Sequence, residues 1–346
     1  MKRRFKMFTP SRLLTAGKII LAGALIAFIV LCKQIDWGTM WHTLASMRWQ
    51  YFIYGLALQW IVMLFGTHRI QILLRAQDVH MTFWRSFSYN CIGFFFSLFS
   101  LGSTGGDVVK AYYISRETDH RKTESVTIVF LDRIMGLTAV LLIAAVSLIA
   151  ILWLTDAFIA TIPLVYAALL LALIACAVVF TKSFWLRFAL VRRAIEYTPH
   201  MLRRAGNALH QYRSHKLIAL VALADSIILQ LLMCVAAWLF GLGLGLVQPW
   251  YIYFVVFPLG TLIMSLPISP SGLGTGDLAF ITSLERFGVE PNPALAFVIL
   301  IRLALYSVSL AGFFLWIMPG THITRKKLAV EAEELKECGQ APQQKT

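Results

Sequence analysis

LGSTGGDVVK, residues 101–110, interrupts an aromatic and apolar run, Cys91 to Phe99, that has the composition of half a membrane span. Glycine is costly inside a helix and tolerated where a backbone bends or packs closely. Asp107 and Lys110 follow the glycines at once, so the interruption is also polar. Irregular, charged backbone at membrane depth occurs only where protein or a water-filled cavity surrounds it. The stretch therefore predicts a re-entrant broken helix, the device with which many transporters build a binding site.

The same pattern occurs a second time in PISPSGLGTGD, residues 267–277. Both stretches contain G-x-x-x-G-D, and each aspartate precedes an arginine in the next apolar run: Arg133 lies 26 residues after Asp107, and Arg302 lies 25 residues after Asp277. Interrupted hydrophobic segments at corresponding positions of two halves indicate an inverted repeat with a site between the halves. The predicted re-entrant turns contain Gly102, Gly105, Gly106, Pro267, Pro270, Gly272, Gly274 and Gly276.

Composition places the chain among membrane proteins. It is 59% hydrophobic and 14% charged, whereas soluble domains carry about a quarter charged residues. Several apolar runs are long enough to cross a bilayer as helices. The net charge of +14 would suggest nucleic acid in a soluble protein, but loops on the cytoplasmic side of membrane proteins collect Lys and Arg. We therefore expect an all-α polytopic membrane protein with no nucleic-acid partner.

The apolar runs predict about six full spans around two re-entrant segments, or seven to eight spans if the broken segments are counted. Residues 1–320 form one transmembrane domain in this reading, and residues 321–346 form a cytoplasmic tail. Arg69, Arg75 and Arg85 follow the second span and indicate a cytoplasmic loop. The spans are 13–32, 51–66, 125–153, 163–180, 217–240 and 293–318, and the re-entrant segments are 86–114 and 250–287.

The distribution of basic residues sets the orientation. Loops assigned to the cytoplasm hold 22 Lys and Arg, and loops assigned to the outside hold three. By the positive-inside rule, both termini and residue 120 lie in the cytoplasm, and residues 40 and 290 lie outside. The first broken segment then enters the membrane from the cytoplasm and the second from outside.

Charged residues beside the broken helices are the candidate substrate contacts. A helix that starts inside the membrane presents free N–H groups and a positive dipole end, which favour an anion. Two structural alternatives stay open: the aspartates cap these helices, or Asp132 or Asp107 pairs with Arg133 and Asp277 pairs with Arg302. Asp225 is a lone acid in an apolar span, either an arginine partner or a proton relay. The candidate substrate-binding residues are Asp107, Lys110, Asp132, Arg133, Asp277 and Arg302.

Signatures of catalysis and cofactor binding are missing from the sequence. It has no H-E-x-x-H, G-x-S-x-G or Walker A motif. The five cysteines are scattered without a C-x-x-C pair, which argues against a metal site or a disulfide framework. The glycines at 241–245 follow a membrane helix instead of a strand, so they predict a turn. We expect a protein that is not an enzyme and that needs no metal or cofactor.

The motifs resemble a known family. The glycine turn with Asp107, LDRIMGL at 131–137 and PISPSGLG at 267–274 are similar to the membrane domain of lysylphosphatidylglycerol synthases, which also occurs alone as a flippase-like family. The resemblance covers most of residues 10–320. This sequence differs from the family's pattern at two positions: it has Lys110 where arginine is common, and Asp277 where glutamate is usual. The matching positions are Gly102, Gly106, Asp107, Lys110, Asp132, Arg133, Pro267, Gly272 and Gly274.

The resemblance implies a multi-pass protein of the bacterial inner membrane that moves or handles lipids with polar heads, or polyprenyl-linked lipids, between leaflets. The full synthases also have a soluble aminoacyl-transferase domain, so we do not expect lysyl transfer by this chain. Two alternatives are a membrane-embedded transferase acting on a lipid-linked substrate and a non-transporting accessory subunit of an envelope pathway. The expected partner is a lipid with an anionic or phosphate-bearing headgroup. A homo-oligomer or an envelope-pathway partner stays open.

Overall fold

A computed structural model describes residues 36–77, 79–99, 104–117, 122–154, 216–266 and 268–318, together with Gly23. These residues form helices without β-strands, which confirms the predicted all-α class. Four described helices are long and apolar enough to span a membrane: Trp49–Arg75, Thr127–Ser147, Leu217–Gly243 and Pro291–Ile317. The predicted spans 13–32 and 163–180 lie outside the described residues. The protein is a multi-pass membrane protein.

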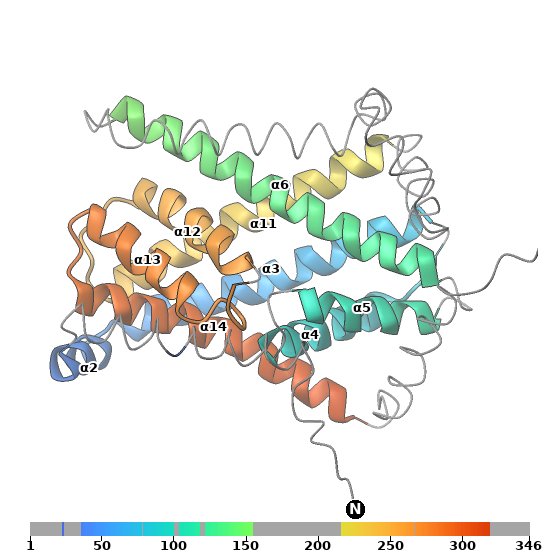
Figure 1. Ribbon diagram of the computed structural model, residues 1–346, viewed down its shortest axis with the longest axis horizontal. Coiled ribbons are helices and arrows are strands. Elements are labelled where there is room, and N and C mark those ends of the chain that lie inside the picture. The colour runs from blue at the N-terminus through green and yellow to red at the C-terminus, as the bar shows by residue number, and fades with distance from the viewer. Residues whose placement is uncertain are drawn as a thin grey trace, which may run out of the picture.

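Two helical hairpins stand where the sequence predicts the broken segments. The first joins α4 (Phe83–Phe99) to α5 (Thr104–Glu117), and the second joins α12 (Trp250–Ser265) to α13 (Thr275–Arg286). The two helices of each hairpin pack against each other. Figure 1 shows the hairpins in opposite halves of the molecule, with α12 and α13 on the left and α4 and α5 on the right. This arrangement agrees with the predicted inverted repeat.

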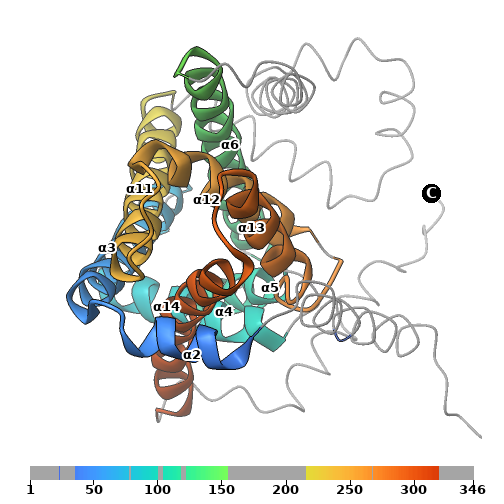
Figure 2. The ribbon, with the colours of Figure 1, turned by 90° about the vertical axis from the view of Figure 1, so that its left-hand side faces the viewer.

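Long helices frame the hairpins. They are α3 (Trp49–Arg75), α6 (Lys122–Leu154), α11 (Lys216–Gly243) and α14 (Pro291–Ile317). α3 packs along α11, and α14 packs against α4 and α13. Seen along the bundle in Figure 2, α3 and α11 lie together on one flank and α12 and α13 on the other.

The apolar core contains a separate cluster around each of the two hairpins. One cluster surrounds the second hairpin and contains Tyr253, Phe280 and Phe297, which are almost completely buried. A second cluster surrounds the first hairpin and contains Ile92 and Tyr113. The helices of each hairpin therefore have their own packed support.

A short amphipathic helix, α2 (Trp37–Ala45), precedes α3. Asp36 caps it by accepting hydrogen bonds from the backbone N–H of Gly38 (3.0 Å) and of Thr39 (3.3 Å). Trp37 and Trp41 are exposed, as is usual for tryptophan at a membrane–water interface. α2 packs on α14.

Candidate functional site

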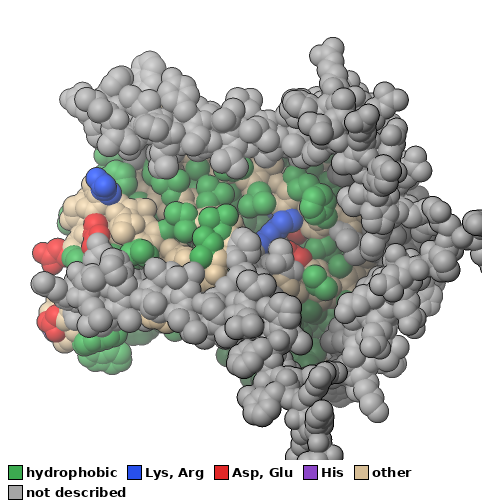
Figure 3. All heavy atoms as spheres, in the orientation of Figure 1, with side chains coloured by type: hydrophobic (Ala, Val, Ile, Leu, Met, Phe, Trp, Pro, Cys, Tyr) green, Lys and Arg blue, Asp and Glu red, His purple; other side chains and the backbone are tan. Residues whose placement is uncertain are grey.

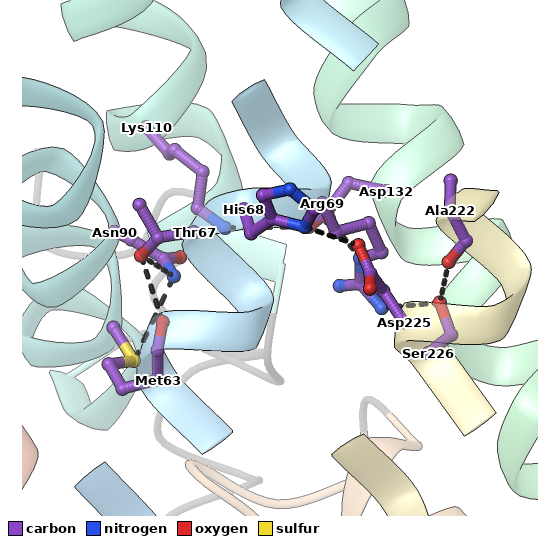
Figure 4. A network of polar contacts seen from close by, with 10 residues as sticks. All are labelled: Met63, Thr67, His68, Arg69, Asn90, Lys110, Asp132, Ala222, Asp225 and Ser226. Atoms are coloured by element: carbon purple, nitrogen blue, oxygen red, sulfur yellow. Dashed lines mark hydrogen bonds and ion pairs between the residues drawn. The ribbon is translucent and has the colours of Figure 1, made fainter. Parts of the chain in front are cut away.

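The centre of the molecule holds a buried carboxylate with two cationic partners. Arg69 Nε donates a hydrogen bond of 2.7 Å to Asp132 Oδ1, and Lys110 Nζ lies 3.6 Å from Asp132 Oδ2. All three side chains are at most 10% exposed. They come from α3, α5 and α6, so the contact ties the first hairpin to two framing helices (Figure 4). Charges buried at membrane depth are expensive unless they are paired, and here each is.

Arg69 corrects one sequence prediction. The second span was expected to end near residue 66, which put Arg69 in a cytoplasmic loop; instead α3 continues to Arg75, and Arg69 is buried. Its Nη1 donates a hydrogen bond of 2.8 Å to Ser226 Oγ on α11, and this hydroxyl donates to the carbonyl of Ala222 (2.7 Å). The predicted end of the span was wrong because hydropathy marks only where the apolar run stops. A helix can continue past that point when its next turn is polar but packed against other helices.

The two aspartate–arginine pairs of the repeat both form, but they differ in strength. Arg133 Nε lies 3.6 Å from Asp107 Oδ2, and the two side chains are 34% and 22% exposed. Arg302 donates to Asp277 Oδ1 from Nε (2.9 Å) and Nη2 (2.7 Å), and that pair is buried. The first pair leaves a partly exposed guanidinium, whereas the second is closed.

Arg302 also holds the connection of the second hairpin. Its Nη1 donates to the carbonyl of Ser271 and its Nη2 to the carbonyl of Gly272, each at 2.9 Å. Ser271 has a φ of 50° and Gly272 has a φ of 66°. This left-handed backbone conformation is rare for residues other than glycine. Asp277 Oδ2 accepts a hydrogen bond from the N–H of Gly274 (2.9 Å). Gly274 is therefore the N-cap of α13, and the aspartate stands three residues inside the helix.

A cavity of about 350 Å³ lies where the hairpins approach each other. Its charged lining consists of Arg69, Lys110 and Arg133 with Asp107 and Asp132, which leaves one positive charge in excess among the described residues. The second half contributes Ser271 and residues of α12. The lining is otherwise largely apolar. Where described residues are visible in Figure 3, hydrophobic side chains predominate, and a basic and an acidic side chain lie next to each other near the middle.

The structure brings some of the predicted site residues together and separates others. Asp107, Lys110, Asp132 and Arg133 line the cavity, while Asp277 and Arg302 reach it only through Ser271. Gly105 and Gly106 lie in the first turn of α5 and Gly276 in that of α13, whereas Pro270, Gly272 and Gly274 lie in the connection. Gly102 and Pro267 lie outside the described residues.

Asp225, the predicted proton relay or arginine partner, pairs with a histidine instead. His68 Nδ1 lies 2.8 Å from Asp225 Oδ2, next to the contact between Arg69 and Ser226 (Figure 4). His68 is 53% exposed and Asp225 is buried. Neither residue lines the cavity. Within the described ranges, no group of three or more His, Cys, Asp and Glu side chains is placed to hold a metal ion.

Sequence reasoning missed the neutral polar lining. Gln59, Asn90 and Gln230 line the cavity and are buried. Asn90 Nδ2 donates to Thr67 Oγ1 (3.4 Å) and approaches Met63 Sδ (3.8 Å). The available signal was an amide residue inside an apolar span, which is costly in lipid and therefore faces the protein interior.

Comparisons with known proteins agree with this architecture. The family model described as the lysylphosphatidylglycerol synthase TM region matches residues 16–312. The chain is also 22% identical over 315 residues to a UPF0104 membrane protein of Methanothermobacter thermautotrophicus (strain Delta H), an alignment that covers 86% of this chain and 93% of that protein. The match to the family model spans most of the chain and confirms the resemblance seen in the motifs. The protein therefore belongs to the lysylphosphatidylglycerol synthase transmembrane-region family.

Proposed function

We propose that the protein binds the anionic, phosphate-bearing headgroup of a lipid in the central cavity and moves that lipid between the leaflets of the bacterial inner membrane. The observation that carries the proposal is the excess of cationic side chains in a cavity between two opposed hairpins. A phosphate would be held there by charge-assisted hydrogen bonds, while the acyl chains remain in the apolar surroundings.

Arg133 is the residue that would engage the phosphate first. Its contact with Asp107 is 3.6 Å long and a third of its side chain is exposed, so a ligand can compete for it at small cost. Arg69 and Lys110 both contact Asp132, at 2.7 Å and 3.6 Å, and their side chains are more deeply buried than that of Arg133. They would supply a fixed positive field that favours an anion beside Arg133.

Both termini lie in the cytoplasm in this proposal, as the positive-inside rule requires. The first hairpin then gives access from the cytoplasmic side and the second from the outside. The family relationship supports a lipid-related role, and we propose binding and translocation without chemical change of the headgroup.

The test is a leaflet-exchange assay in proteoliposomes with a tail-labelled anionic phospholipid. Hydrogen bonds to charged groups contribute about 1.5–3 kcal/mol, so Arg133→Gln should slow exchange by roughly one to two orders of magnitude. Thermal stability should change by less than about 1 kcal/mol, because a partly exposed ion pair contributes little. Arg286→Gln, at an exposed arginine outside the cavity, is the matched control.

Three outcomes would contradict the proposal. Rescue of Arg133→Gln by Asp107→Asn would show that the arginine serves only its ion pair. A wild-type protein that fails to accelerate exchange would favour an accessory role. A headgroup whose mass changes during the assay would indicate a transferase.

A further inference from the structure

A histidine–aspartate pair joins α3 to α11 directly beside the cationic part of the site. His68 Nδ1 lies 2.8 Å from Asp225 Oδ2. The next residue of each helix makes a second contact, in which Arg69 Nη1 donates a hydrogen bond of 2.8 Å to Ser226 Oγ. Figure 4 shows the two contacts next to each other. The pair therefore sits against an arginine that lines the cavity, although neither of its own residues does.

The cation of this pair is a histidine, the side-chain type that gains or loses a proton near neutral pH. The other ion pairs among the described residues use Arg or Lys, which ordinarily keep their charge there. The side chain of Asp225 is 9% exposed, whereas that of His68 is 53% exposed. The ring can therefore exchange a proton at the outside of the bundle while the carboxylate stays buried within it.

The place of His68 along α3 gives it access from one side of the membrane. It lies seven residues before Arg75, the last residue of the helix, which corresponds to about 10 Å along the axis. In the orientation that we propose, this end of α3 faces the cytoplasm. The proton would thus be exchanged with the cytoplasmic side.

The chemistry of the ring fixes which proton moves. Nδ1–H donates to the carboxylate in both forms of the imidazole, so the exchanging proton is the one on Nε2. With that proton the pair of His68 and Asp225 carries no net charge, and without it the pair carries one negative charge. A negative charge beside Arg69 weakens the positive field that an anion in the cavity experiences. Protonation of the pair and binding of an anion therefore favour each other, and this coupling acts in both directions.

Other ionisable groups near the pair belong to α3, α11 and the helices packed against them, which are α4, α6, α12 and α14. Tyr and Cys side chains on these helices ordinarily titrate above neutral pH, carboxylates below it, and Arg and Lys well above it. His68 is the only histidine on these six helices. The described charged side chains on them, together with their partners, are Arg75, Arg69 and Lys110 with Asp132, Arg133 with Asp107, Arg85 with Glu117, and Arg302 with Asp277.

We propose that His68 and Asp225 form a proton-binding site coupled to the cavity, so that the protein takes up a proton when it binds an anionic headgroup. The inference rests on the proposed function and adds a second ligand, the proton, to the same binding step. A pH difference across the membrane would then bias the direction in which the lipid moves.

The test measures binding of short-chain phosphatidylmethanol by calorimetric titration of the purified full-length protein, from about pH 5.5 to about pH 8.5, the range in which histidine titrates. This phosphate diester keeps one negative charge throughout, so a pH dependence comes from the protein. The wild-type affinity should fall about five- to tenfold as the pH rises, which is in the lower part of the usual range for coupled sites. Titrations in buffers of different ionisation enthalpy should show net proton uptake on binding.

Variants of the pair should change the pH dependence in a defined direction. The double variant His68→Gln with Asp225→Asn keeps two amide groups that can hydrogen-bond between the helices, and it is neutral at every pH. Its affinity should stay at the low-pH value of the wild type across the range. Asp225→Asn alone should reach the same value at high pH, because no negative charge remains beside Arg69. His80→Gln, at an exposed histidine outside the cavity, is the matched control and should keep the wild-type pH dependence.

A purely structural pair gives a different result. If the pair only held α3 against α11, both variants would bind more weakly than the wild type at every pH. That result, a wild-type affinity independent of pH, or a pH dependence that persists in the double variant would each overturn the inference and leave the proposed function intact. If the double variant does not fold, Asp225→Asn decides, and an affinity at high pH no better than that of the wild type overturns the inference. A wild-type protein that binds no phosphatidylmethanol at any pH would overturn the proposed function as well.

Discussion

Arg302 donates two hydrogen bonds to one carboxylate oxygen of Asp277, from Nε at 2.9 Å and from Nη2 at 2.7 Å. The same guanidinium holds two carbonyl groups of the hairpin connection, those of Ser271 and Gly272. The equivalent residue of the first half, Arg133, makes a contact of 3.6 Å to Asp107 and stays partly exposed. A symmetrical sequence repeat has therefore produced one arginine that fixes a turn and one that faces a cavity.

Replacing Arg302 should damage the fold before it affects lipid binding. Arg302→Gln leaves Asp277 buried without its cation and frees two carbonyl groups, and breaking a buried pair from one side costs about 3–5 kcal/mol. Thermal unfolding in detergent, followed by circular dichroism, should show a large decrease in stability. The double variant Arg302→Gln with Asp277→Asn should recover part of it, because no buried charge remains. A single variant as stable as the wild type would refute the role of Arg302 as a turn-holding residue.

Arg69 should behave like Arg302, although it lines the cavity. Arg69→Gln removes the hydrogen bond of 2.7 Å to Asp132 and leaves that carboxylate with Lys110 Nζ at 3.6 Å. We expect a loss of about 3 kcal/mol, near the lower end of the range for a buried pair, and recovery when Asp132→Asn is added. Arg75→Gln, at an exposed arginine of the same helix, should leave the unfolding midpoint unchanged. If Arg75→Gln lost as much stability, the effect would come from removing a positive charge and not from breaking the contact between Arg69 and Asp132.

Close packing inside the first hairpin gives a steric prediction. A Cβ atom at Gly106 would overlap the carbonyl oxygen of Gly93 and the hydroxyl of Ser97, so Gly106→Ala must separate α4 from α5. Overpacking of this kind costs about 1–3 kcal/mol, which exceeds the gain of about 1 kcal/mol in helix propensity. At Gly66, in contrast, an added Cβ would lie 3.6 Å from Asn90 Nδ2 and from Leu229 Cδ1, an ordinary contact. Thermal unfolding should therefore show Gly106→Ala destabilised and Gly66→Ala unchanged or slightly stabilised; equal stabilities would argue against the tight hairpin.

The proposed orientation can be tested by labelling single cysteines in intact cells. His42 and Glu290 are exposed at the end of the molecule that we assign to the outside, and Arg116 is exposed in the last turn of α5, which we assign to the cytoplasm. In a background without the five native cysteines, a membrane-impermeant maleimide should modify positions 42 and 290 in intact cells and position 116 only after permeabilisation. Modification of position 116 from outside would exclude a first hairpin that enters from the cytoplasm.

The fold class, the two hairpins and the aspartate–arginine pairs could all be predicted from local sequence. Glycine clusters inside apolar runs are local features, and they indicate where a membrane helix must break because lipid cannot satisfy irregular backbone. The similar spacing from Asp107 to Arg133 (26 residues) and from Asp277 to Arg302 (25 residues) likewise placed each pair on consecutive helices, where the two side chains meet. These relationships depend on residues close together in the chain.

The sequence by itself determined that the chain is a helical membrane protein with two broken helices in an inverted repeat. The tertiary structure alone decided which charges are open to a ligand, because burial and pairing depend on helices far apart in the chain. Arg69 meets Ser226 across 157 residues, and the same contact surface places Asp225 against His68. Hydropathy registers how polar a residue is, whereas its neighbours across the bundle determine whether that polarity is satisfied.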